Sequence, residues 1–198
     1  MGVWDDLLQR TKFTTREGEF KRPKPEDLDR FEAEFGFKLP ADYREFALAF
    51  GPGALGEGEW SFQTPGFPGV GPDFDLAEAN ANRGLPNYSD AELTERGDPA
   101  LIRRLVGFCK GGMEGDRFSW DPAEVTDPEK HEYAIYITCG DLKPLTQRAA
   151  STFREIVMDY LLGGGYERQV YEAGTESSEP QSPKKIEYSQ DRMGGDRA

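Results

Sequence analysis

The sequence is poor in the residues that most metal and catalytic sites require. It contains one histidine, His131, and two cysteines, Cys109 and Cys139, among 198 residues. One histidine cannot supply a paired-histidine zinc motif, and two cysteines cannot form a disulfide framework. Both cysteines lie in strand-like segments, where burial as a small apolar side chain is the usual role. We therefore expect no metal site and two reduced thiols.

Long apolar runs and the common catalytic motifs are also missing. No stretch approaches the length of a membrane-spanning helix, and the first ten residues carry acids where a signal peptide carries bases. The glycine-rich turn 110–116 lacks the Lys-Ser/Thr pair of a phosphate-binding loop, and no Gly-x-Ser-x-Gly motif occurs. Carboxylates are abundant, but no pair of them stands out as a catalytic dyad. These absences favour a cytoplasmic protein without membrane contact, and they point to no cofactor and no catalytic residue, although an enzyme stays open as an alternative.

What the sequence has in excess is negative charge. The formal net charge is −13, and nearly all of it comes from residues 56–100 and 113–133. A field of this sign repels phosphate backbones, so direct binding of nucleic acid is disfavoured. The same field attracts a basic protein partner. The alternative is a solvated acidic surface that only confers solubility.

The apolar periodicities predict an α+β domain. Helices are expected over residues 3–10, 25–36, 40–50, 90–96 and 145–162. Strands are expected over residues 60–63, 101–109, 117–121 and 133–138, with a Gly/Pro-rich loop at 65–75 and a hairpin turn at 110–116. Helices that precede and follow a group of strands are typical of a mixed or antiparallel sheet packed against helices.

The composition changes after Tyr171. Residues 172–198 are rich in Ser, Gly, Pro and charged residues and nearly free of large apolar ones. Such a segment has too little apolar surface to offset the entropy lost on folding. The predicted organisation is one domain over residues 1–171, followed by a disordered polar tail over residues 172–198.

Aromatic residues occur within the first acidic stretch. Aromatic side chains among acids are typical of protein interaction surfaces, where they act as anchors. The alternative is that they fix a long loop to the core. The residues predicted to bind a partner are Glu57, Glu59, Trp60, Phe62, Phe67, Asp73, Asp75 and Glu78.

The segment Phe31–Leu55, FEAEFGFKLPADYREFALAFGPGAL, resembles the SUKH superfamily, the group of Smi/Knr-type proteins and many bacterial immunity proteins. The matching residues are Phe35-Gly36, Leu39-Pro40, Asp42-Tyr43, Phe46 and Phe50-Gly51. Gly115-Asp116 before a strand and the apolar helix ending near residue 162 are weaker similarities. The chain departs from the family pattern at Gly51-Pro52-Gly53, where Asn-Gly-Gly is commoner, and in the acidic region 56–100.

The resemblance implies an α+β domain of the SUKH type without catalytic residues. It further implies a cytoplasmic antitoxin that binds and blocks a cognate protein toxin, such as a nuclease or a deaminase. Toxins that act on nucleic acid tend to have basic clefts, which an acidic protein can occupy as a substrate mimic. Two alternatives are an intracellular scaffold or regulatory binding module of the same fold, and an uncharacterised enzyme.

Overall fold

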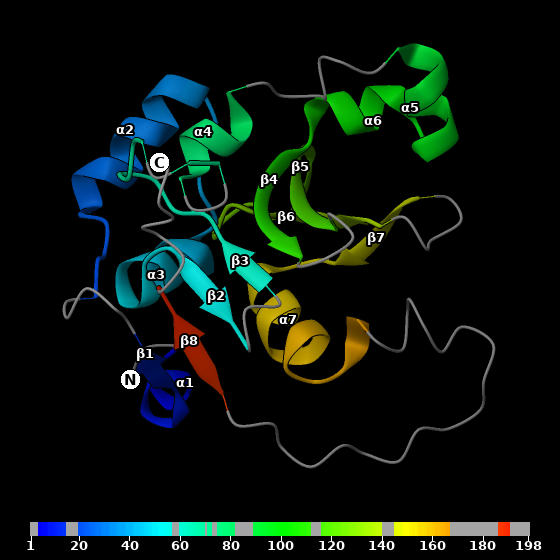
Figure 1. Ribbon diagram of the computed structural model, residues 1–198. Helices are drawn as coiled ribbons and strands as arrows, with labels where there is room; N and C mark the ends of the chain where they lie inside the picture. Colours follow the sequence, from blue (N-terminus) through cyan, green and yellow to red (C-terminus); the bar gives the residue numbers. More distant parts are fainter. Residues whose placement is uncertain are drawn as a thin grey trace, which may run out of the picture.

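The computed structural model arranges helices against one continuous sheet (Figure 1). It describes residues 4–14, 20–56, 60–69, 71–72, 75–81, 89–111, 116–139, 145–166 and 186–190. The helices within these ranges are α1 (Asp5–Arg10), α2 (Pro25–Phe35), α3 (Ala41–Phe50), α4 (Leu76–Asn80), α5 (Asp90–Arg96), α6 (Pro99–Arg104) and α7 (Phe153–Glu155), which continues into the π-helical η1 (Ile156–Leu161). The strands are β1 (Lys12–Thr14), β2 (Gly53–Leu55), β3 (Trp60–Phe62), β4 (Val106–Gly111), β5 (Arg117–Asp127), β6 (Glu132–Thr138), β7 (Thr146–Ala150) and β8 (Glu187–Ser189).

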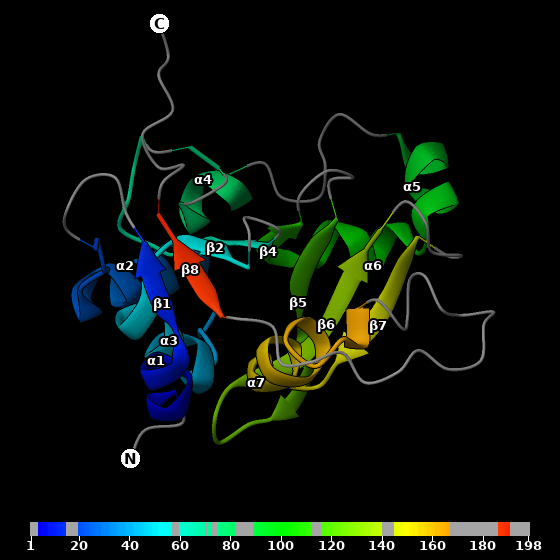
Figure 2. The same cartoon turned by 60° about the horizontal axis from the view of Figure 1, so that its bottom comes forward.

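The strands of the described residues form one mixed sheet in the order β1-β8-β2-β3-β4-β5-β6-β7. Only β1 and β8 run parallel within it, and the remaining neighbours are antiparallel. Figure 2 shows β1 and β8 side by side at one side of the molecule and β7 at the other. The predicted α+β class, with a mixed sheet packed against helices, is confirmed.

The core lies between the sheet and the pair α2–α3. Gly36 ends α2 at a φ of +62°, a left-handed conformation that glycine adopts without strain. The apolar face of α3 is fully buried, and the Phe46 ring lies 4.9 Å from Phe62 in β3 and 5.2 Å from Phe153 in α7. Aromatic rings at these separations add to the free energy of burial. The helix pair predicted from the spacing of aromatic residues is therefore present and faces inward.

The prediction of one helix over residues 145–162 is partly wrong. Residues Thr146–Ala150 form β7, which pairs with β6, and the helical segment begins only at Phe153. The TQRAA segment has no apolar stripe for a helix to bury, and of its side chains only that of Thr146 is buried. Pairing with β6 satisfies backbone groups that would otherwise lack partners at that edge.

The predicted strand over residues 101–109 also begins too early. Its first residues belong to α6, because Asp98 accepts the N–H of Ala100 at the start of that helix and Pro99 suits the first turn. Only the apolar stretch from Val106 onward enters the sheet as β4. The short helix α4 was missed, and Asn80 at its end bonds both the N–H and the C=O of Gly107 in β4.

The predicted disorder of residues 172–198 does not hold for residues 186–190. These residues include β8, which is inserted between β1 and β2, and the Tyr188 side chain is fully buried. The buried Tyr188 ring and the buried, hydrogen-bonded Gln190 amide thus fix a segment of mostly polar composition. The rest of the predicted tail lies outside the described residues, and the five described residues belong to the sheet of the domain.

Candidate partner-binding surface

The predicted partner-binding residues fall into three groups. Glu57, Glu59 and Asp73 lie outside the described residues. Trp60 and Phe62 are in β3, and Phe67, Asp75 and Glu78 lie in the loop and helix that follow.

Trp60 and Phe62 are core residues and not exposed anchors. The Trp60 side chain is 8% exposed and that of Phe62 is fully buried. The Trp60 ring lies 5.1 Å from Phe118 in β5 and 4.7 Å from Tyr166. Because β3 lies between β2 and β4, alternate side chains on its inner face point into the core. For these two residues the alternative interpretation, that aromatics fix this part of the chain to the core, is correct.

Asp75 and Glu78 hold the preceding loop in place. The buried Asp75 carboxylate accepts the N–H of Glu78 through Oδ1 and the N–H of Phe67 through Oδ2, both at 2.9 Å. The Glu78 carboxylate accepts the N–H of Gly69. Phe67 and Glu78 are half-buried. Carboxylates directed at backbone N–H groups stabilise a turn, so these two acids contribute less to the outer surface than their sequence position suggested.

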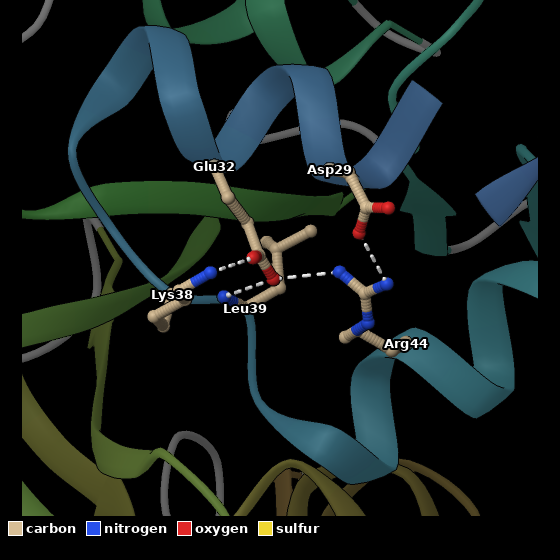
Figure 3. A network of polar contacts seen from close by, with 5 residues as sticks. All are labelled: Asp29, Glu32, Lys38, Leu39 and Arg44. Atoms are coloured by element: carbon tan, nitrogen blue, oxygen red, sulfur yellow. Dashed lines mark hydrogen bonds and ion pairs between the residues drawn. The ribbon is translucent and has the colours of Figure 1, made fainter. Parts of the chain in front are cut away.

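An ionic network surrounds the buried Glu32 of the motif at residues 31–55 (Figure 3). Glu32 in α2 accepts Lys38 Nζ and Arg44 Nη1 at 2.7 Å each, and the backbone N–H of Leu39 at 3.2 Å. Arg44 in α3 also donates to Asp29 at 2.8 Å. Burial alone raises the pKa of Glu32, but the hydrogen bonds from Lys38 and Arg44 outweigh it and leave the pKa below its usual value. This network joins α2 to α3, so these motif residues have a structural role.

Glu132 is a second buried carboxylate and lies where β6 meets two helices. Its Oε2 accepts the N–H of Phe153, the first residue of α7, at 3.0 Å. Burial, and to a smaller extent the Asp42 carboxylate at the start of α3, raise its pKa to about 7 against the opposing effect of hydrogen bonds from backbone N–H groups. A side chain only 1% exposed has no access to a partner or substrate, which makes Glu132 a structural acid.

The exposed acids that the structure describes in the first acidic stretch belong to α5 and α6. This group, called here the α5–α6 acids, consists of Asp90, Glu92, Glu95 and Asp98. Their helices stand at the upper right of Figure 1, away from α1, α2 and α3. The pair is held by the buried side chains of Leu93 and Ile102 and by Arg104, whose Nε and Nη2 donate to Asp121 of β5 at 2.8 and 2.7 Å.

The α5–α6 acids were absent from the predicted binding residues, although the sequence carries a signal for most of them. Ser89 and Glu92 form a capping box, and Asp98 precedes Pro99. Both patterns mark the first turns of short helices, where acidic side chains interact favourably with the helix dipole and commonly remain in water. The sequence therefore carried a signal for exposure of Asp90, Glu92 and Asp98, which lie at helix starts, but none for Glu95 in the last turn of α5.

No group of His, Cys, Asp or Glu side chains in the described ranges could hold a metal ion. Among the described helices, none has both the length and the apolar character needed to span a membrane.

Comparison with known proteins and protein families places the chain in a family. No curated protein and no solved structure matches this sequence. Among protein families, the SMI1 / KNR4 family (SUKH-1) matches residues 22–159, which run from the residues before α2 into η1. The matched region holds the α2–α3 pair and β2 to β7, whereas β1 and β8 lie outside it. Since the match covers more than two thirds of the chain, the protein belongs to the SMI1/KNR4 family (SUKH-1).

Proposed function

We propose that this protein is an immunity protein of the cytoplasm that binds and blocks a toxin with a basic surface, without catalysing a reaction. Membership of the SMI1/KNR4 family supports the general class. The net charge of −13 supports the basic character of the partner. A nuclease or another toxin that acts on nucleic acid has such a surface, because it must attract phosphates.

The observation that carries the proposal is the position of the α5–α6 acids. Residues 89–98 hold four acids against one base, and the acids lie on the exposed side of a helix pair that is set apart from the main core. Glu57, Glu59 and Asp73, from the predicted set, are proposed as further contacts. Exposed charges of this kind act chiefly on the rate of association, which they increase by attraction over distance.

The test uses as its probes the toxin domains encoded in the same genome, starting with any that is encoded next to this gene. Co-expression with the full-length protein should restore growth of cells that produce the toxin domain, and the two proteins should form a complex. A complex without restored growth would support the scaffold alternative. The proposal is contradicted if the protein neither restores growth nor forms a complex with any toxin domain encoded in the same genome.

Two triple variants separate local charge from total charge. Glu57→Lys/Glu59→Lys/Glu95→Lys changes the proposed surface, and Glu26→Lys/Glu34→Lys/Glu45→Lys changes exposed positions on α2 and α3. Both variants change the net charge equally. Association with the toxin domain at low salt should slow by about tenfold or more for the first variant and much less for the second. Equal effects of the two variants would contradict the proposed surface.

A further inference from the structure

The C-terminal strand β8 fills a slot between two strands from the opposite end of the chain. Within residues 186–190, β8 pairs in parallel with β1 and antiparallel with β2. Backbone hydrogen bonds join Lys12 N–H to Ile186 O at 2.9 Å and Gln190 N–H to Thr14 O at 3.1 Å. The space that these five residues occupy between β1 and β2 is called here the strand slot.

The centre of the strand slot is shaped for a tyrosine. The Tyr188 ring is fully buried at 5.3 Å from Phe50, and its hydroxyl donates to the carbonyl oxygen of Gly51 at 2.7 Å. Gly53 in β2 leaves the room for this ring, because a Cβ at that position would lie 2.5 Å from Tyr188 Cε1. A phenylalanine would leave the Gly51 carbonyl without this donor, and a smaller side chain would leave a cavity.

The end of the strand slot is shaped for an amide. Gln190 Nε2 donates to the carbonyl oxygens of Lys21 and Pro52, and its Oε1 accepts the N–H of Lys21, each at 2.7 Å. Both donors and the acceptor of the side chain are thus used. Glu187 and Ser189 remain half-exposed. The slot therefore selects Tyr and Gln two residues apart and tolerates other side chains at the position between them and at the position before the Tyr.

The chain length before β8 is large for a connection inside a domain. Nineteen residues, 167–185, separate Tyr166 from Ile186. Connections in compact domains are commonly about 4–6 residues long, and this one can extend to about 60 Å. Neither β8 nor this connection is part of the region that matches the family, although β2 is. The connection is long enough for β8 to reach the strand slot of another molecule.

We propose that the strand slot is a peptide-binding site for an extended Tyr-x-Gln segment, and that a second copy of this chain can supply the segment. Two copies would then exchange β8 strands and form an intertwined dimer. Each slot in that dimer has the same contacts as in the monomer, so the equilibrium depends mainly on protein concentration. Covalent attachment favours each chain's own strand when the protein is dilute.

Disulfide trapping tests this exchange in the full-length chain. Ala54 in β2 and Ser189 in β8 are paired across the slot. The variants Ala54→Cys and Ser189→Cys are mixed, unfolded in denaturant, refolded together and oxidised. The native Cys109 and Cys139 are buried. The disulfide-linked dimer of the two variants should increase about tenfold or more between about 2 and about 200 µM protein.

Three further samples make the result decisive. The double variant Ala54→Cys/Ser189→Cys should give a cross-linked monomer when refolded dilute. Adding Tyr188→Ala to the Ser189→Cys chain should abolish the dimer, whereas adding Glu187→Ala should leave it. The exchange is contradicted if the double variant cross-links but the mixed pair does not at about 200 µM. A dimer that persists with Tyr188→Ala, or a double variant that does not cross-link, contradicts the slot itself.

Discussion

Two helix pairs of this protein, α2–α3 and α5–α6, are held to the sheet by different forces. Tyr43, Phe46 and Phe50 on α3 are fully buried and lie within one aromatic cluster. The α5–α6 pair buries Leu93 and Ile102 and depends on the Arg104–Asp121 ion pair. The two pairs lie far apart in both Figure 1 and Figure 2. The comparison indicates that α2–α3 is part of the core, whereas α5–α6 mainly presents a surface.

The charges of the two pairs differ in the same way. In α2–α3 the buried Glu32 is shared by Lys38 and Arg44, so its charge is neutralised inside the fold. In α5–α6 the Asp90 side chain pairs with Arg103 but remains 81% exposed. Acidic side chains therefore have two roles in this chain: the buried ones take part in ion pairs within the fold, and the exposed ones give the surface its negative charge.

The largest effect should follow from truncation of the α2–α3 core. Phe46→Ala removes a ring that packs on Phe50, Phe62 and Phe153, and should lower the free energy of unfolding by about 3–5 kcal/mol. Denaturant titration monitored by circular dichroism measures it. Glu45→Ala, on the exposed face of the same helix, is the control and should change stability by no more than about 0.5 kcal/mol. A near-neutral Phe46→Ala would show that α3 does not face the core.

The buried Glu132 should make the free energy of unfolding depend on pH. Glu132 has a folded-state pKa raised to about 7 from 4.5. Stability should therefore fall as the pH rises from about 4.5 to about 7, because the unfolded chain releases the proton first, with a total loss of about 3 kcal/mol. Glu132→Gln should remove this loss and be the more stable protein at pH 8. Parallel stability profiles of the two proteins from pH 5 to pH 8 would contradict the assignment.

The two ion pairs should respond unequally to loss of their arginine. Arg104→Met leaves the fully buried Asp121 without its bidentate partner and should cost about 2–3 kcal/mol, since Arg104 itself is partly exposed. Arg44→Met should cost about 1 kcal/mol, because Glu32 keeps Lys38 and the N–H of Leu39. Thermal or denaturant unfolding of both variants measures the difference. Equal losses would mean that Lys38 and the N–H of Leu39 do not compensate Glu32 for the loss of Arg44.

The smallest effect on stability should come from the exposed acids. Glu95→Lys should change the free energy of unfolding by no more than about 0.5 kcal/mol, because an exposed charge on a short surface helix contributes little. Glu34→Lys on α2 is the matched change on the other helix pair. Unfolding of both variants should coincide with that of the parent protein. A loss above about 1 kcal/mol for Glu95→Lys alone would show that α5 is more closely integrated than its exposure indicates.

Local patterns predicted the elements that bury a regular apolar stripe. The spacing of Tyr43, Phe46 and Phe50 indicated α3, and Gly36 and Gly51 marked the ends of the two helices. The alternation of Tyr133, Ile135 and Ile137 indicated β6. These elements could be predicted from the sequence because their buried side chains recur with the period of the helix or of the strand.

Elements defined by distant partners could not be predicted in this way. The TQRAA segment is a strand because β6 offers an edge, and Glu187–Ser189 form β8 because β1 and β2 leave a slot. The same holds for the candidate surface. Trp60 and Asp75 lie among acids in the sequence but are buried, while the acids of α5 remain in water.

By itself, the sequence determined the α+β class, the inward-facing α2–α3 pair, the family resemblance and the acidic excess. These properties depend on composition or on spacings of a few residues. Only the tertiary structure decided which acids are exposed, which aromatics are core and where the C-terminal strand lies. Each of those depends on contacts between residues far apart in the chain, such as Gly51 with Tyr188. The burial of a side chain is set by the residues that pack around it in the folded protein, and not by its own segment.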